Sequence, residues 1–198
     1  MASSAVTTPS SAEEAVAAIA ADPDATIMVG GTLVMSQVAL GYRTVDRAVW
    51  LGKAGLDAIH EADGRLTVGG MATLAACEDL VAPIGPCAAN VGDRELRAQA
   101  TFGGNICSDL PFGDLRGPLL ALDASIRLGG AAGERTVGAA EFLADIGADV
   151  VLDVSFDVPA AGAFVPLRRH HTHAPTAIGV SAVRSPDGEV RVAATGVA

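Results

Sequence analysis

The first fifty residues switch between the apolar spacing of helices and that of short strands. Ser10 and Ser11 are each followed three residues later by glutamate, a capping-box pattern that marks a helix start. The pattern from there predicts a helix, a strand, a helix and a strand over Ala12–Ala21, Thr26–Val29, Leu33–Leu40 and Asp46–Leu51. This order, with a glycine turn after the first strand, is typical of a parallel α/β unit. The small and polar residues 1–9 predict a loose lead-in.

A hairpin and several helices are predicted between residues 56 and 122. Asp63–Gly64 is a strong hairpin-turn signal, and Asp93 is suited to cap a short helix. The expected strands cover Leu56–His60 and Arg65–Val68, and the expected helices cover Met71–Val81, Asp93–Arg97 and Leu115–Leu122.

The last third of the chain has strand patterns. Between Val150 and Val158, apolar residues alternate with aspartate and serine at a period of two. Further strands are expected over Ser125–Leu128, Phe164–Leu167, Ala177–Val183 and Glu189–Ala193. We therefore expect an α+β protein in three parts: an α/β part over residues 1–58, a second part over residues 59–160, and an antiparallel β segment over residues 161–198.

Composition and charge exclude several classes of partner. Half of the 198 residues are apolar, which suffices for a buried core in one or two domains. The net charge is -10, with 13 lysines and arginines against 23 acidic residues, so the surface repels nucleic acid and anionic lipid. The most apolar stretch, Thr26–Leu40, is shorter than the roughly 20 residues of a bilayer span. Met1–Ser11 lacks the features of a secretory signal, and a cytoplasmic protein is expected.

Residues that often bind metals are interpreted as structural. The cysteines lack Cys-x-x-Cys spacing and are expected to be free thiols in the core; they are Cys77, Cys87 and Cys107. A histidine cluster is interpreted as a solvated loop without a metal; it comprises His170, His171 and His173. Tyr42 and Trp50 are expected to pack in the core.

Familiar nucleotide and catalytic motifs are absent. The sequence has no Walker loop, no Gly-x-Gly-x-x-Gly fingerprint, no Gly-x-Ser-x-Gly elbow and no His-Glu-x-x-His pair. Two glycine pairs with a threonine nearby stand out instead, in Gly30-Gly31-Thr32 and in Thr101-Phe102-Gly103-Gly104-Asn105.

Such pairs suit a pyrophosphate. Without a Cβ atom the backbone can approach the anion and adopt positive φ angles that make successive N–H groups converge. Thr32 and Thr101 add hydroxyl groups, and a following helix adds the partial positive charge of its N-terminus. Glycine pairs are also common in turns, and this chain has 23 glycines. The pairs alone therefore leave a purely structural role open.

The segments around the glycine pairs resemble one known family. Val29–Thr32, Val68–Leu74 and Gln99–Ile106 occur in that order, followed by Asp114-Leu115 and Leu119–Ala124. Together they resemble the FAD-binding, medium subunit of the molybdenum hydroxylases, the family of xanthine dehydrogenase and aerobic carbon monoxide dehydrogenase. The resemblance spans residues 12–196. It implies a two-subdomain FAD-binding fold, with a small parallel α/β subdomain, a larger and mostly antiparallel subdomain, and a C-terminal β domain that is truncated here.

The resemblance also implies which residues contact FAD. In the family, two glycine-pair turns hold the pyrophosphate, and an aspartate further along contacts the cofactor. Carried over, the cofactor-binding residues are Val29, Gly30, Gly31, Thr32, Leu33, Thr101, Gly103, Gly104, Asn105 and Asp114. The aspartate can accept hydrogen bonds from a ribose or ribityl chain, with a helix cap as the alternative role. No catalytic residue is expected, because the flavin supplies the reactivity.

Electron relay is the function that the resemblance implies. A molybdopterin subunit and an iron–sulfur subunit would be the partners, and FAD would pass electrons to NAD, a quinone or oxygen; a homo-oligomer is left open. The chain departs from the family at Leu33, often aspartate, and at Leu110-Pro111, often Ser-Pro. The family also continues into helices beyond Ala198. These departures leave two alternatives: a flavin-free interaction or assembly module, and a stand-alone flavoenzyme of small-molecule metabolism.

Overall fold

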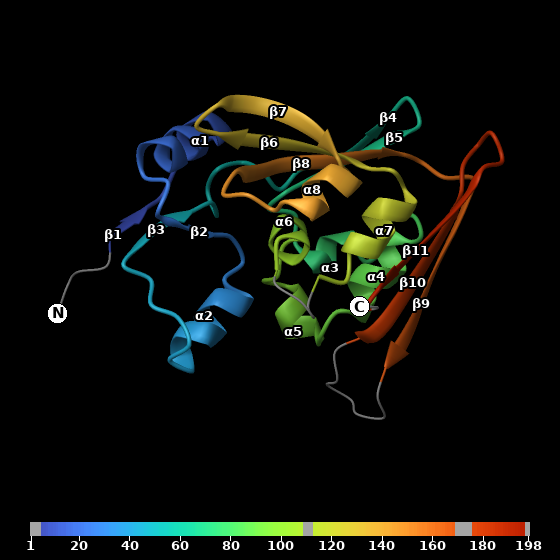
Figure 1. The fold of residues 1–198 in the computed structure, drawn as a ribbon, viewed down its shortest axis with the longest axis horizontal. Helices are drawn as coiled ribbons and strands as arrows, with labels where there is room; N and C mark the ends of the chain where they lie inside the picture. Colours follow the sequence, from blue (N-terminus) through green and yellow to red (C-terminus); the bar gives the residue numbers. More distant parts are fainter. Residues whose placement is uncertain (1–4, 109–112, 169–175, 197–198) are drawn as a thin grey trace.

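The computed structural model describes residues 5–108, 113–168 and 176–196, which form three sheets (Figure 1). The first sheet is parallel, and its strand order is β1-β3-β2. Its strands are β1 (Ala5–Thr7), β2 (Thr26–Met28) and β3 (Arg47–Trp50). The predicted parallel α/β unit is confirmed. The expected loose lead-in is wrong over β1, whose three side chains are all exposed and therefore give no apolar pattern.

The second sheet is antiparallel, with the order β4-β5-β8-β6-β7. Its strands are β4 (Ile59–Ala62), β5 (Arg65–Gly69), β6 (Ser125–Gly130), β7 (Gly133–Gly138) and β8 (Val150–Asp157). The hairpin predicted at Asp63–Gly64 is confirmed, and both turn residues have positive φ. β7 was not predicted, because it is an edge strand with only one buried residue, Val137.

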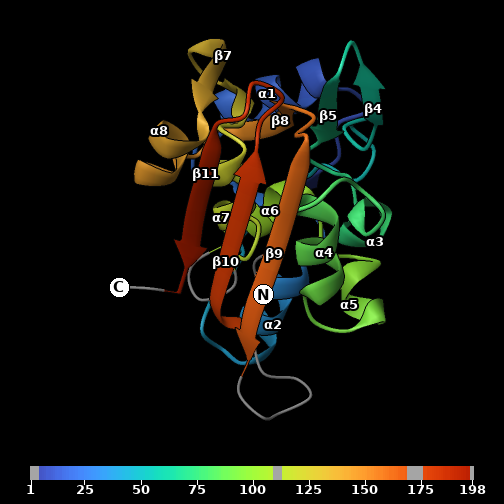
Figure 2. The same cartoon turned by 90° about the vertical axis from the view of Figure 1, so that its right-hand side faces the viewer.

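The third sheet is also antiparallel and has the order β11-β10-β9 (Figure 2). It consists of β9 (Ala161–Arg168), β10 (Thr176–Arg184) and β11 (Val190–Thr195), so the three strands predicted here are confirmed. Its inner face packs on helices α4 and α7.

The helices are short. They are α1 (Ala12–Ala21), α2 (Thr32–Ala39), α3 (Leu74–Cys77), α4 (Ile84–Asn90), α5 (Arg94–Arg97), α6 (Phe102–Ile106), α7 (Arg116–Ala121) and α8 (Ala139–Ala144). The predicted caps are confirmed at Ser11, which accepts from the Glu14 amide at 3.2 Å, and at Asp93, which accepts from the Leu96 amide at 2.8 Å. None of the helices in the described ranges is long and apolar enough to cross a bilayer.

The helix predicted over Met71–Val81 is wrong over most of its length, since α3 has only four residues. The Met71 amide donates to the Leu56 carbonyl at 2.8 Å, and the Gly70 amide donates to a carbonyl of β8 at 3.0 Å. These bonds extend the pairing of β5, so the backbone before residue 73 is not available for a helix.

Two buried clusters share strand β8. Val150 and Leu152 pack with α1 and β3, whereas Val154 and Phe156 pack with helices α3, α4, α6 and α7. The β6–β8 pairing shifts register at Arg127/Leu128, and an irregularity of this kind sends the side chains beyond it to the other face. The predicted alternating segment forms one strand, as expected, but its apolar residues are divided between two hydrophobic cores.

The sheets fall within the ranges 1–58, 59–160 and 161–198, but the cores do not follow these limits. Val150 and Leu152 complete the core of the first range, and Val183 of the third range belongs to the core of the second. The three-part division stays a prediction.

Candidate functional site

One cavity of about 700 Å³ lies where the three sheets and helices α2, α6 and α7 approach each other. Its walls come from all three parts of the chain, from Asp24 near the first sheet to Thr176 at the start of β10. All ten residues predicted to contact a cofactor line this cavity: Val29, Gly30, Gly31, Thr32, Leu33, Thr101, Gly103, Gly104, Asn105 and Asp114. The structure thus brings together residues that lie 85 positions apart in the sequence (114 minus 29). Their contact with a cofactor stays a prediction.

The first glycine turn leaves backbone donors free. Gly31 is the N-cap of α2, with a φ of 71° that favours glycine, and its carbonyl accepts the Met35 amide at 2.8 Å. Within the described part of the chain, the amides of Thr32, Leu33 and Val34 donate to no other group. Amides of a first helical turn point along the axis beyond the helix N-terminus. The cavity wall therefore carries three unused N–H donors together with the positive end of an eight-residue helix.

The second glycine turn uses its donors internally. Thr101 caps α6 by accepting from the Gly104 amide at 3.1 Å, the Gly103 amide donates to the Gly70 carbonyl at 2.9 Å, and the Asn105 amide donates to the Thr101 carbonyl at 2.9 Å. The expectation of bared amides at both turns is therefore wrong at this one. The Thr101 side chain is buried and acts as a helix cap.

Each glycine pair also lies in close contact with the chain segment next to the other pair. A Cβ atom on Gly30 would lie 2.0 Å from the Gln99 carbonyl oxygen, and one on Gly104 would lie 2.8 Å from Cγ2 of Val29. Both distances are shorter than any real Cβ contact. The missing side chains thus allow the turn after β2 to lie directly on the segment that leads into α6.

Asn105 positions the segment that carries the predicted aspartate. Its buried side chain accepts the Leu115 amide through Oδ1 at 3.0 Å. The neighbouring Asp114 lines the cavity, and burial raises the pKa of its carboxyl, an effect that the Thr176 hydroxyl and the Arg168 charge partly oppose. The helix-cap alternative for Asp114 is wrong, because the N-cap of α7 is Leu115 and uses no side chain.

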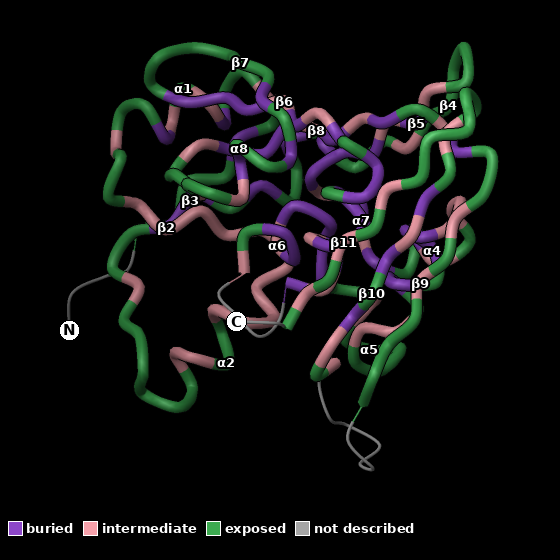
Figure 3. Tube along the Cα trace, turned by 45° about the vertical axis from the view of Figure 1, so that its right-hand side comes forward, coloured by how far each residue is buried: buried purple, intermediate pink, exposed green. Residues whose placement is uncertain are grey.

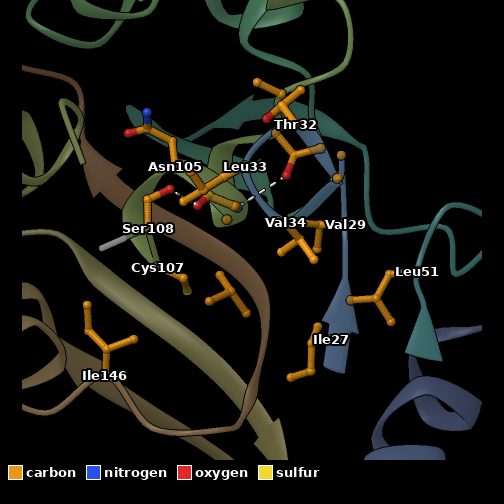
Figure 4. A pocket seen from close by; sticks show the side chains of 18 of the residues that line it. Ile27, Val29, Thr32, Leu33, Val34, Leu51, Asn105, Cys107, Ser108 and Ile146 are labelled. Atoms are coloured by element: carbon orange, nitrogen blue, oxygen red, sulfur yellow. Dashed lines mark hydrogen bonds between the residues drawn. The ribbon is translucent and has the colours of Figure 1, made fainter. Parts of the chain in front are cut away.

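Polar and apolar groups divide the cavity wall. Figure 4 shows Thr32, Asn105 and Ser108 on one side, and Ile27, Leu51 and Ile146 on the other. Three arginines also line the cavity: Arg43, Arg116 and Arg168. The Arg116 guanidinium donates to the Ile106 carbonyl at 2.9 Å and to the Ser108 carbonyl, so it braces the end of α6.

Several lining residues were missed from the sequence. Ser108 donates to the Gly104 carbonyl at 2.7 Å, and a hydroxyl four residues after a glycine pair was the available signal. The loop Ile146–Asp149 precedes β8 and lines the cavity, but its only sequence mark is Gly147. Ile27 in β2 and Leu51, the residue after β3, also line the cavity, and nothing in their apolar spacing distinguishes them from core positions.

The cysteines are free thiols, as predicted, but only two are core residues. Cys77 and Cys87 are fully buried, and burial raises the pKa of the Cys77 thiol to about 12. The expectation of a core position is wrong for Cys107, which is exposed and lines the cavity. The surrounding protein atoms still withdraw this thiol from bulk water enough to raise its pKa to about 11.

Two aromatic side chains are also more exposed than predicted. Tyr42 is 81% exposed and Trp50 is 38% exposed, so neither is a core residue.

The predicted histidine loop (His170, His171, His173) and Leu110-Pro111 lie outside the described residues. Among the residues that are described, no group of three or more histidine, cysteine, aspartate and glutamate side chains is arranged to hold a metal ion.

Residues 2–156 match the family model for the FAD binding domain in molybdopterin dehydrogenase. A carbon monoxide dehydrogenase from Hydrogenophaga pseudoflava, lacking the Mo-pyranopterin moiety of the molybdenum cofactor, superposes with a TM-score of 0.88 at 23% identity, over 98% of this chain and 75% of that chain. Reconstituted CO dehydrogenase from Oligotropha carboxidovorans gives 0.87 at 24% identity, over 99% and 76%. Quinoline 2-oxidoreductase from Pseudomonas putida 86 gives 0.82 at 22% identity, over 98% and 74%. No curated protein sequence matches significantly. The predicted fold is confirmed.

Proposed function

Because the chain belongs to the family of FAD-binding domains of molybdopterin dehydrogenases, we propose that its cavity holds FAD with the pyrophosphate at the N-terminus of α2. The observation that carries this proposal is the set of free amides at Thr32, Leu33 and Val34 beside Gly31. A pyrophosphate needs several donors within roughly 2.7–3.2 Å, and a first helical turn presents them together with a favourable dipole.

The cavity suits the remainder of a dinucleotide in size and polarity. Its volume of about 700 Å³ lies within the range of roughly 300–1,000 Å³ that is usual for ligand pockets. The apolar wall with Ile27, Leu51 and Ile146 can receive a flat ring system, while the glycine turns receive the charged groups. Since the net charge of -10 repels phosphate at long range, the attraction depends on these local donors.

Asp114 is proposed to accept hydrogen bonds from ribose or ribityl hydroxyl groups. Its carboxyl is partly desolvated and lines the cavity, and the Asn105–Leu115 bond fixes the backbone on its C-terminal side. Donors from a ligand would satisfy a charge that burial otherwise makes costly.

Within this proposal the protein is an oxidoreductase subunit that relays electrons. Bound FAD would supply the redox chemistry, taking electrons from an iron–sulfur and molybdopterin partner and giving them to NAD, a quinone or oxygen. The residues of the chain bind and orient the cofactor and exclude water from the apolar wall. The cytoplasmic location stays a prediction from the sequence.

An absorption spectrum of the purified chain tests the proposal directly. We expect an oxidised flavin spectrum, or its appearance after FAD is added to the flavin-free protein, and bleaching by dithionite. Protein that stays colourless after incubation with FAD contradicts the proposal and favours the interaction module. Reduction of a small molecule without any iron–sulfur donor favours the stand-alone flavoenzyme; electron uptake from a reduced two-iron ferredoxin supports the relay.

Protection of Cys107 tests where FAD binds. It is the only exposed cysteine among the three, and it lines the cavity. Because its pKa is about 11, labelling with a small thiol reagent is best followed at pH 9. FAD should slow labelling of Cys107 severalfold while Cys77 and Cys87 stay unlabelled in either sample. An unchanged rate at saturating FAD would place the flavin elsewhere.

A further inference from the structure

Polar residues from separate elements meet on one wall of the cavity. They are Asn90, the last residue of α4, Asp114 just before α7, Arg168 at the end of β9 and Thr176 at the start of β10. The Asn90 side chain donates through Nδ2 to the Thr176 hydroxyl at 2.7 Å, and the Arg168 guanidinium donates to the Asn90 carbonyl. Asn90 is thus bonded to the ends of β9 and β10 that line the cavity.

The Asn90 amide determines which way the Thr176 hydroxyl points. A threonine hydroxyl has one proton to donate and two lone pairs that accept. Because one lone pair takes the N–H of Asn90, the proton is directed to a different acceptor. That acceptor is the Asp114 carboxyl, to which the Thr176 side chain is hydrogen-bonded. The three side chains therefore form a hydrogen-bond chain in which each donates to the next, ending at a carboxylate.

The surroundings of Asp114 leave part of its carboxyl available to a ligand. Among the described residues, the charged or titratable groups that act on it are Arg168 from β9 and the Cys87 thiol from α4. Burial raises the pKa of Cys87, so this thiol stays neutral, and Arg116 of α7 donates to backbone carbonyls at the end of α6 instead. A carboxylate offers about four lone-pair sites. Thr176 and the backbone of Asp114 use some of them, and the others are left for donors in the cavity.

We propose that Asn90 and Thr176 are positioning residues that orient the Asp114 carboxylate toward the hydroxyl groups of a bound ligand. This inference rests on the proposed function, in which Asp114 accepts hydrogen bonds from the ribose or ribityl chain of FAD. The bond from Thr176 fixes the carboxyl before the ligand arrives, so less side-chain freedom is lost on binding. It also favours the ionised carboxyl, which is the stronger acceptor. Since burial raises the pKa of Asp114, loss of the Thr176 hydroxyl should raise that pKa further.

The pKa of Asp114 in the flavin-free protein tests the hydrogen-bond chain without a ligand. It can be followed by carbon-13 NMR of the side-chain carboxyls, with Asp114→Asn to identify the resonance. Thr176→Val should raise this pKa, because it removes the donor and keeps the shape, whereas Thr176→Ser should keep the wild-type value. Asn90→Ala should raise it by less, since the hydroxyl remains but is no longer directed. The matched control is Thr67→Val, at a half-buried strand threonine that does not line the cavity, and it should leave the pKa unchanged.

FAD affinity gives the second readout. Thr176→Val should weaken binding about fivefold, and the pH below which affinity declines should move upward together with the pKa of Asp114. Thr176→Ser and Thr67→Val should bind FAD as the wild type does. An unchanged Asp114 pKa in Thr176→Val or in Asn90→Ala, with FAD binding intact, overturns this proposal alone, as does a raised pKa without any change in affinity. A wild type that binds no FAD overturns the proposed function and this inference with it.

Discussion

Gly30–Gly31 and Gly103–Gly104 each lie within two residues of a threonine at the start of a helix, yet the backbone around the two pairs is used differently. The first pair begins α2, which has no buried residue and leaves its first amides free; the second begins α6, which is largely buried and bonds every amide from Phe102 to Asn105 internally (Figure 3). The same glycine pair therefore leaves free amides on the cavity wall in one place and bonds its amides within the fold in the other. The difference is whether acceptors in the fold already take hydrogen bonds from the amides of the turn.

The largest effect is expected from Gly31→Ala. An alanine at a φ of 71° costs about 1–2 kcal/mol, and the turn would relax away from the geometry that aligns the free amides. FAD affinity should fall about 100-fold, measured by fluorescence titration. The control is Gly41→Ala at the other end of α2, which has a similar φ of 75° and open space around it, and which should leave affinity unchanged. Equal losses in both variants would show that backbone strain alone is responsible.

Gly103→Ala should act on stability instead. Its Cβ atom would lie 2.8 Å from the Gly70 carbonyl oxygen, so the two backbones must separate. We expect a loss of about 1–3 kcal/mol, which lowers the melting temperature of the flavin-free protein by about 2–12 °C. Gly138→Ala, with nothing near its Cβ position, is the matched control. A variant that melts normally but loses FAD would give the second turn the role assigned to the first.

The two threonines sharpen the contrast further. Thr101→Val removes the cap on the Gly104 amide and should cost about 1 kcal/mol of stability, with little change in flavin affinity. Thr32→Val should leave the melting temperature within experimental error but weaken FAD binding severalfold, through the loss of a hydroxyl donor. Thermal melts and flavin titrations on both variants test these expectations. If Thr101→Val weakened FAD binding and Thr32→Val lowered the melting temperature, the roles of the two turns would be exchanged.

The smallest effect concerns the pH dependence at Asp114. Burial raises the pKa of this carboxyl, so its contribution to stability is fully present below the unfolded-state pKa and is lost as pH rises through the folded-state pKa. Asp114→Asn should therefore flatten the decline in the melting temperature of the flavin-free protein over that range. FAD affinity at pH 7 should fall about tenfold. The exposed Asp57→Asn serves as the control, and a pH profile identical to the wild type would remove Asp114 from the site.

The sequence predicts which helices and strands exist better than it predicts where each begins and ends. Local signals such as the Ser11 cap, the Asp63–Gly64 turn and the strand from Val150 are confirmed, because each depends on neighbouring residues alone. The helix over Met71–Val81 fails at its start because Gly70 and Met71 continue the strand pairing of β5, with the Met71 amide bonded to the Leu56 carbonyl and the Gly70 amide bonded to β8. The strands β1 and β7 could not be predicted from apolar spacing, because they are exposed and have almost no buried side chain.

The same limit applies to the cavity. Family resemblance and glycine pairs located ten lining residues, because a glycine beside threonine leaves a mark in the sequence. The apolar wall leaves no such mark, since Ile27 and Leu51 look the same whether they face a core or a ligand. The state of an amide, free or bonded, depends on partners such as Gly70 that only the folded chain brings near Gly103.

Strand β8 bears on whether the N-terminal part is autonomous. Because Val150 and Leu152 belong to the buried cluster against which α1 packs, a fragment ending at residue 58 would leave Ala15 and Ile19 more exposed to water. Such a fragment should precipitate or remain unstructured. The intact chain, for the same reason, should melt in one cooperative step, with helix α1 and strand β8 unfolding together although they lie far apart in the sequence.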